Sequence, residues 1–287
     1  MCDEQQLARW ANSKLTRRGF GAGALAGSAA ACAPMDMAAG GDTSALTERN
    51  VTFPTSAGTM DGEFFHPASG TRPGVIFWPD IAGIRPAKRE MARRLASQGY
   101  AVLLANPYYR DVAGQQFSDF ANFAGNDGFQ KVRPWREKFT TATKRTDAAA
   151  CADWLMRQDA VDKDRGIGAQ GYCMTGSFAL VAPSAHDAIH AGASFHGGGL
   201  VTDDPQSPHR TLQGDAHYLI AIAQDDDAKA PGDKTALRNA AQAAGADAEI
   251  DVYAGDHGWC VLDSPSYDRA EAERAWANLL ELYRADL

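Results

Sequence analysis

Apolar runs alternate along most of this chain with segments whose apolar residues recur every three or four positions. Continuous apolar runs of about five residues predict buried strands of a parallel sheet, and the amphipathic segments between them predict helices. Strands and helices in alternation predict an α/β fold, with a mostly parallel central sheet and helices on both faces. The predicted strands lie at 74–78, 101–105, 166–170, 191–195, 218–223 and 248–253.

The remaining elements follow from turn and cap residues. Two short stretches, 50–54 and 62–65, flank Gly58 and predict an opening antiparallel hairpin. A proline near the first turn and a glycine stop delimit a helix over 86–98. Further helices are predicted at 140–158, 234–244 and 269–283.

One long segment, 108–138, has no clear periodicity. A segment of this length inside a compact domain is usually functional. We therefore expect it to line a pocket, although part of it can form a short helix that packs on the core. Its polar residues are interspersed with Phe117, Phe120, Phe123, Phe129 and Trp135.

The segment Gly171-Tyr172-Cys173-Met174-Thr175-Gly176 stands between a predicted strand and an apolar stretch that predicts a helix. A strand, a sharp turn with one nucleophile and a helix form a nucleophile elbow, here with cysteine in place of the commoner serine. The turn strains its central residue, and small residues on either side keep strand and helix apart. The position of Cys173 at the start of a helix favours its thiolate. A buried structural cysteine is the alternative.

A thiol nucleophile needs a base, and the base needs an acid that orients it. In a parallel sheet, both groups stand in loops after the carboxyl ends of later strands. Asp225-Asp226-Asp227 and His257 each follow such a strand, in the order nucleophile, acid, histidine that α/β-hydrolases have. Three consecutive aspartates leave the choice of acid open.

These motifs resemble those of the dienelactone hydrolase family, from about residue 50 to the C-terminus. The resemblance rests on Gly171-Tyr172-Cys173, on Asp226 and on His257-Gly258-Trp259. It also rests on Trp78-Pro79-Asp80-Ile81 and Asn106-Pro107-Tyr108-Tyr109-Arg110, which follow early strands. The resemblance implies an α/β-hydrolase fold and a small-molecule ester or lactone substrate, with neither a metal nor an organic cofactor.

The resemblance also implies a catalytic triad. Cys173 is then the nucleophile, His257 the base and Asp226 the acid that orients the base. Asp226 is preferred to its two neighbours because the family places its acid three residues after a small residue that ends the strand, here Ala223.

Five further positions gain a role by the same resemblance. The backbone N–H groups of Ile81 and Met174 form an oxyanion hole. Asp80 stands where the family usually has a glutamate near the cysteine, and Arg110 matches an arginine that holds a substrate carboxylate. His196 lies at another strand end near the site, where it contacts substrate, donates a hydrogen bond or has a structural role. A surface position is the alternative for Arg110.

Three departures from the family pattern change these expectations. Asp80 is shorter than the usual glutamate and reaches less far toward the thiol. Val261 stands where the family has a second substrate-binding arginine, so only one of the two arginines that would bind a substrate carboxylate is expected here. Thr175 replaces a glycine and is expected to crowd the elbow. A disulfide between Cys173 and Cys260 is a further alternative for the thiol.

Composition restricts the class of protein. The chain has 287 residues and a formal net charge of -8, which suits one α/β domain with an extension and argues against nucleic acid as a partner. No apolar run reaches the roughly 18 residues of a membrane-spanning helix. Five scattered cysteines show no zinc spacing, and His186 and His190 lack a third ligand, so no metal site is predicted.

Residues 1–40 indicate an export signal, which leaves 41–287 as the hydrolase domain. Arg17-Arg18-Gly19-Phe20 precedes a short Gly/Ala run that ends in a small-residue cleavage site. This order resembles a twin-arginine signal, as in exported members of the family, and predicts a periplasmic protein. A flexible basic tail is one alternative. Lipid anchoring at Cys32 is another, although Ala29 stands where such sites usually carry leucine.

The predicted function is ester or lactone hydrolysis by a cysteine nucleophile, similar to that of a carboxymethylenebutenolidase. Two alternatives use the same scaffold. One is an exported promiscuous carboxylesterase or acyl transferase with the same triad. The other is a catalytically silent binding protein, which Thr175 and the missing second arginine suggest. The natural substrate and the oligomeric state stay open.

Overall fold

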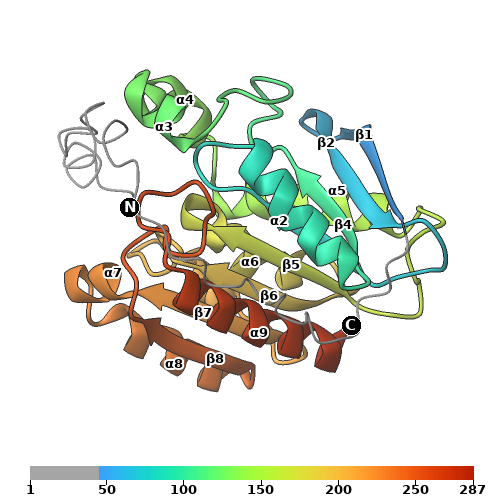
Figure 1. Cartoon of the computed structure of the whole chain (residues 1–287). Helices are drawn as coiled ribbons and strands as arrows, with labels where there is room; N and C mark the ends of the chain where they lie inside the picture. The colour runs from blue at the N-terminus through green and yellow to red at the C-terminus, as the bar shows by residue number, and fades with distance from the viewer. Residues whose placement is uncertain (1–44) are drawn as a thin grey trace, which may run out of the picture.

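The structure is a computed structural model that describes residues 45–287. Its strands form one eight-stranded sheet in the order β1-β2-β4-β3-β5-β6-β7-β8. β2 pairs antiparallel with β1 and β4, and all other neighbouring strands are parallel (Figure 1). The mostly parallel sheet and the opening hairpin are thereby confirmed. The strands are β1 (Leu46–Thr55), β2 (Gly58–Pro67), β3 (Gly74–Trp78), β4 (Ala101–Ala105), β5 (Ile167–Tyr172), β6 (Ile189–Phe195), β7 (His217–Ala223) and β8 (Asp247–Tyr253).

Every helix expected in the sequence is present within a few residues of its predicted bounds. Helix ends follow local chemistry: α5 begins with a capping box in which Thr140 and Thr143 satisfy each other's backbone N–H groups. The helices are α2 (Pro86–Ser97), α3 (Phe120–Gly125), α4 (Gly128–Arg136), α5 (Thr141–Leu155), α6 (Gly176–Val181), α7 (Gln224–Lys229), α8 (Asp233–Ala244) and α9 (Arg269–Asp286).

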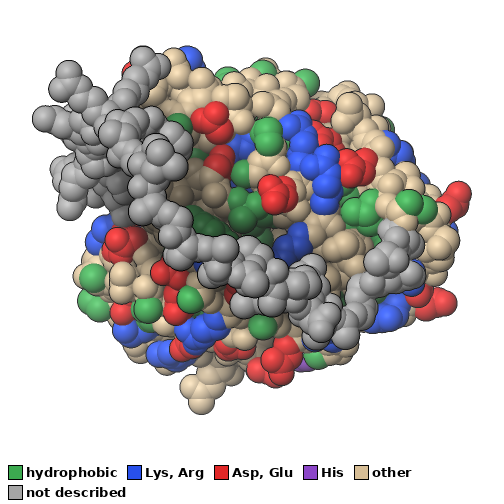
Figure 2. Space-filling view, viewed as in Figure 1, with side chains coloured by type: hydrophobic (Ala, Val, Ile, Leu, Met, Phe, Trp, Pro, Cys, Tyr) green, Lys and Arg blue, Asp and Glu red, His purple; other side chains and the backbone are tan. Residues whose placement is uncertain are grey.

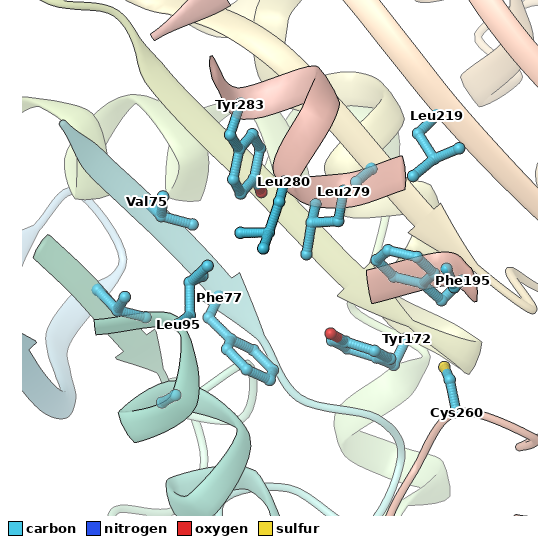
Figure 3. Packing of buried hydrophobic residues seen from close by; sticks show 14 of the residues in the cluster. Val75, Phe77, Leu95, Tyr172, Phe195, Leu219, Cys260, Leu279, Leu280 and Tyr283 are labelled. Carbon is cyan, nitrogen blue, oxygen red and sulfur yellow. The ribbon is translucent and has the colours of Figure 1, made fainter. Parts of the chain in front are cut away.

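The helices cover both faces of the sheet, and the period of two along each strand decides which side chains meet which helices. In β7, Leu219 and Ala221 face the core under α2 and α9, whereas Tyr218 and Ile220 face α8. Figure 3 shows the first of these cores, where Leu279, Leu280 and Tyr283 of α9 pack beside Val75 and Phe77 of β3. On the other face, α5 and α6 cover β3 and β5.

The face formed by α2 and α9 carries intermixed charges (Figure 2). Arg89, Arg93 and Arg94 of α2 pair with carboxylates of β2, β1 and α9, respectively. A cavity of about 260 Å³ opens between the two helices and is lined by apolar residues such as Met91 and Trp276. This face therefore combines surface ion pairs of α2 with a cavity that has apolar lining residues.

The segment 108–138 is more ordered than its sequence predicted. It contains two short helices, α3 and α4, and packs Phe117, Phe123 and Val132 into a cluster that also contains Cys173. The alternative of short helices that pack on the core is thereby realised, and the aromatic side chains form a wall beside the elbow. The expectation that the segment lines a pocket is met at its end, where Arg136 lines a cavity.

The predicted export signal at 1–40, with Cys32, lies outside the described residues, so export stays a prediction. Within 45–287, no helix is both long enough and apolar enough to cross a membrane.

Candidate active site

Cys173 directly follows β5 and has a φ of 56°, in the left-handed region that non-glycine residues rarely adopt. Such strain costs about 1–3 kcal/mol and persists only where the surroundings enforce it. Here a 3₁₀ turn over Cys173–Thr175 leads straight into α6, and the N–H of Gly198 donates to the Cys173 carbonyl over 2.9 Å. The predicted elbow geometry is confirmed.

Two glycines, Gly171 and Gly176, make the elbow possible. A Cβ at Gly171 would lie 2.0 Å from the carbonyl oxygen of Thr175, and one at Gly176 would lie 2.6 Å from the Cα of Gly197. The second small residue of the elbow is thus Gly176, three positions after Cys173 rather than two.

Thr175 does not crowd the elbow, so that expectation was wrong. Its side chain is fully buried, and its hydroxyl accepts from the N–H of Tyr172 over 3.0 Å. The same hydroxyl lies 3.0 Å and 2.9 Å from the carbonyl oxygens of Trp78 and Pro79, to which it can donate in turn. Thr175 therefore ties the elbow to the end of β3.

His257 stands in the loop after β8, at the same edge of the sheet as the elbow. Its Nδ1 lies 2.5 Å from Oδ2 of Asp226, in α7. The neighbouring aspartates are engaged elsewhere: Asp225 accepts from the backbone N–H of His257, and Asp227 pairs with Lys234. The geometry therefore favours Asp226, among the three, as the acid that orients the histidine ring.

The expected oxyanion donors flank the elbow. Met174 lies in the first turn of the 3₁₀ helix, where N–H groups have no partner within the helix. The N–H of Gly83 donates to the Asp80 carbonyl and closes a turn in which Ile81 is the second residue. The N–H of Ile81 is therefore not used within that turn. Ile81 and Cys173 belong to the same buried cluster.

Tyr108 is a residue to which the sequence assigned no role. Its hydroxyl donates to the Ile81 carbonyl over 2.8 Å and lies 3.7 Å from the sulfur of Met174. Burial raises the pKa of Tyr108, so the hydroxyl keeps its proton. Tyr108 thereby fixes the peptide that follows Ile81 and contacts both expected oxyanion residues.

His196 lies edge-on against His257, with the ring centroids 4.8 Å apart. It is 1% exposed, and neither ring nitrogen has a hydrogen-bond partner among residues 45–287. Burial, and then the nearby His257, holds the pKa of His196 well below its usual value, so the ring is neutral at pH 7. His196 therefore packs against the catalytic candidate, and substrate contact stays a prediction.

Two buried cations hold the Asp80 carboxylate. Arg85 donates to both Asp80 oxygens, and Lys88 lies 2.9 Å from one of them. Arg85 in turn binds Asp263 in the loop after β8. Asp80 is therefore part of an ion-pair network that joins two loops, and a contact of Asp80 with the thiol or with substrate stays a prediction.

Arg110 is likewise occupied. Its guanidinium makes two hydrogen bonds to Asp147 of α5, at 2.7 Å and 2.6 Å, and Tyr109 donates to the same carboxylate. Since Asp147 already neutralises this cation, the structure does not offer Arg110 as a carboxylate-binding group. Val261, where a second arginine was expected, is buried in the core.

Cys260 is a free cysteine, so the alternative of a Cys173–Cys260 disulfide is not realised. Burial raises the pKa of the Cys260 thiol, which argues against a second nucleophile there. Among the described residues, no group of three or more His, Cys, Asp or Glu side chains is placed to hold a metal ion.

The sequence pattern of the dienelactone hydrolase family matches residues 60–287. The chain belongs to this family. The family and its carboxymethylenebutenolidase relatives indicate a hydrolase that acts on ester or lactone bonds.

Individual relatives agree with this assignment. A provisionally named carboxymethylenebutenolidase from Yersinia pestis is 25% identical over 75% of this chain and 79% of its own length. Among solved structures, one called m3DLH has a TM-score of 0.70 at 24% identity and covers 84% of this chain and 99% of its own. The dienelactone hydrolase-like promiscuous phosphotriesterase P91, from metagenomic libraries, has a TM-score of 0.65 at 25% identity and covers 84% and 98%. The α/β-hydrolase fold expected from the sequence is thereby confirmed.

Proposed function

We propose that this family member hydrolyses carboxylic esters or lactones with Cys173 as the nucleophile. The observation that carries the proposal is the 2.5 Å contact between Asp226 and His257 at the sheet edge that bears the strained elbow. A carboxylate on Nδ1 leaves Nε2 of the histidine to accept a proton, as a base in such a triad does.

The reaction begins when His257 takes the thiol proton and the sulfur of Cys173 bonds to the carbonyl carbon. The carbonyl electron pair moves to oxygen, and the N–H groups of Met174 and Ile81 hold the oxyanion. Its collapse breaks the ester bond, and the leaving alkoxide takes the proton from His257. Water then attacks the thioester, gives a proton to His257, and releases the carboxylic acid and the thiol.

Substitution of Cys173 tests this mechanism. We expect Cys173→Ala to lower kcat/KM for 4-nitrophenyl acetate, assayed with a thiol reductant, by about a thousandfold or more, because a triad loses its function with its nucleophile. Cys151→Ala, at a buried free cysteine of α5, is the matched control and should retain activity. Undiminished hydrolysis by Cys173→Ala would contradict the mechanism and favour a different nucleophile.

An acyl transferase would use the same groups but would pass the acyl chain to an alcohol or amine. A comparison of product ratios with and without such an acceptor separates the two activities. A silent binding protein would show no turnover of either kind and no labelling of Cys173 by iodoacetamide at pH 7.

Export is proposed on the sequence alone, from the paired arginines Arg17 and Arg18 ahead of a short Gly/Ala run. The mass of the protein recovered from the periplasm tests it: a chain that still begins at Met1 would contradict cleavage.

A further inference from the structure

A cavity of about 180 Å³ borders the elbow. Its wall includes Met174, whose N–H is a proposed oxyanion donor, and Gly198, whose N–H donates to the Cys173 carbonyl. Phe139 and Phe178 supply its apolar surface. The cavity therefore adjoins the place where the reacting carbonyl is expected to lie.

Two cations line this cavity without an acidic partner. Arg136 ends α4 and Lys144 lies in the first turns of α5. Neither forms an ion pair with any residue of 45–287, and the Nε of Arg136 is buried without a hydrogen-bond partner in that range. Lys144 is only 9% exposed, and its ammonium lies 5.5 Å from the ring centroid of Phe178.

Burial of an unpaired cation such as Lys144 is costly, because the charge loses water and gains no counter-ion. Elsewhere the chain avoids that cost: Arg85 is paired with Asp80 and Asp263, and Arg110 with Asp147. Arg136 and Lys144 have no such counter-ion among residues 45–287, and they lie beside the elbow, where an incoming anion can neutralise them.

We propose that Arg136 and Lys144 form a subsite for an anionic group of the substrate, such as a carboxylate at the end of a short acyl chain. The inference rests on the proposed esterase function and names a substrate class for it. The subsite differs in position from the carboxylate site that was expected at Arg110 and residue 261. Arg110 is bonded to Asp147, and residue 261 is a buried valine. A planar guanidinium and an ammonium together can hold both oxygens of one carboxylate.

The size of the cavity limits the anion. At about 30 Å³ for each water-sized group, 180 Å³ has room for roughly six such groups, which is enough for a short chain such as glutaryl. Mono-4-nitrophenyl glutarate and 4-nitrophenyl pentanoate have acyl chains of equal length and differ in one terminal carboxylate. They are therefore a matched anionic and neutral pair.

The decisive measurement is the ratio of kcat/KM for the glutarate ester to that for the pentanoate ester. We expect the wild-type ratio to exceed one, and Arg136→Gln or Lys144→Met to lower it about tenfold each, since each variant removes one charge-assisted contact. Arg133→Gln, on the same helix but with a side chain 68% exposed, is the matched control and should leave the ratio unchanged. A ratio of one or less, or an equal loss on both esters, would overturn the subsite.

Binding without turnover keeps this test separate from the proposed mechanism. Titration calorimetry of glutarate into Cys173→Ala should show binding that the Cys173→Ala/Lys144→Met variant loses. If glutarate binds but neither ester is hydrolysed by the wild type, the esterase proposal fails and the anion subsite stands. If both esters are hydrolysed but glutarate does not bind, the subsite fails and the esterase stands.

The pH dependence gives a second readout. Burial lowers the pKa of Lys144 to about 8, so its charge is present at pH 7 and is lost as the pH rises through that value. The other charged group of the cavity is Arg136, and Ser177, Phe178 and the glycines carry no charge. The glutarate-to-pentanoate ratio should therefore fall between pH 7 and 9 in the wild type. It should stay flat over that range in Lys144→Met; a wild-type ratio that does not change would contradict the role of Lys144.

Discussion

At the scale of single residues, one buried hydroxyl holds the elbow against β3. Thr175→Val keeps the shape of the side chain but removes the acceptor for the Tyr172 N–H and the donor to the carbonyls of Trp78 and Pro79. Because a buried polar group left unpaired costs about 1–3 kcal/mol, we expect the free energy of unfolding to fall by that amount. Urea denaturation measures it.

The control for this change is Thr146→Val, on the exposed side of α5, where the hydroxyl bonds only to the carbonyl one turn earlier. It should alter stability by less than about 0.5 kcal/mol. Equal effects of the two substitutions would mean that the Thr175 hydroxyl contributes nothing particular to the elbow.

Some features of the site at the scale of single residues could be predicted from the sequence, and others could not. The order of nucleophile, acid and histidine followed from the sequence, and the family resemblance favoured Asp226. The residues alone left the acid open, because consecutive residues in the first turn of α7 point in directions about 100° apart. Which of them meets His257 depends on how α7 crosses the loop after β8. Arg110 was misjudged for a related reason: its availability depends on Asp147, 37 residues later, which no local pattern reveals.

At the scale of elements, the contact between α6 and β6 sets the position of the elbow. A Cβ at Gly176 would lie 2.4 Å from the Ser194 hydroxyl and 2.6 Å from the Cα of Gly197, so backbone must move. Gly176→Ala should lower the free energy of unfolding by about 1–3 kcal/mol through overpacking. It should also lower kcat/KM, because the 3₁₀ turn that carries Cys173 and Met174 leads directly into α6.

Gly125→Ala provides the comparison, since no atom lies within 4 Å of a Cβ at that position, the last of α3. Helix propensity alone makes it neutral or stabilising, by up to about 1 kcal/mol. Thermal unfolding and 4-nitrophenyl acetate hydrolysis, measured side by side, distinguish the two glycines. A Gly176→Ala enzyme as stable and active as the wild type would contradict the close-approach argument.

The long strands and helices were predictable as elements because their hydrophobic periods persist over several turns or pleats. The segment 108–138 was not, because α3 and α4 have only six and nine residues and offer too few turns for a period to emerge. Its aromatic content nevertheless indicated the role that the structure shows, as the wall beside Cys173.

At the scale of the whole molecule, three segments distant in sequence meet at the carboxyl edge of the sheet. Asp80 and Arg85 follow β3, Phe120 begins α3, and Asp263 follows β8. Arg85 binds both carboxylates, and the N–H of Phe120 donates to Asp263 over 2.9 Å. The network therefore links the loop of Ile81, the aromatic wall and the loop of His257 in one buried unit.

The stability of this unit should depend on pH. Burial opposes the ionisation of Asp80, but Arg85 and Lys88 outweigh it and hold the folded-state pKa well below its usual value. A depressed carboxyl pKa contributes stability above the unfolded-state pKa, near 4, and loses it as the pH falls below that value. The wild-type free energy of unfolding should therefore decline steadily from about pH 5 to pH 3.

Asp80→Asn isolates that contribution. At pH 7 the variant should be less stable than the wild type by about 3–5 kcal/mol, because Arg85 and Lys88 stay buried without their shared counter-ion. The gap should narrow as the pH falls, since protonation of Asp80 brings the wild type toward the variant. Glu273→Gln, which removes the exposed partner of Arg94, should differ from the wild type by less than about 1 kcal/mol throughout. Urea denaturation at pH 7, 5, 4 and 3 measures all three proteins, and a gap for Asp80→Asn that stays constant would show that Asp80 does not ionise within this network.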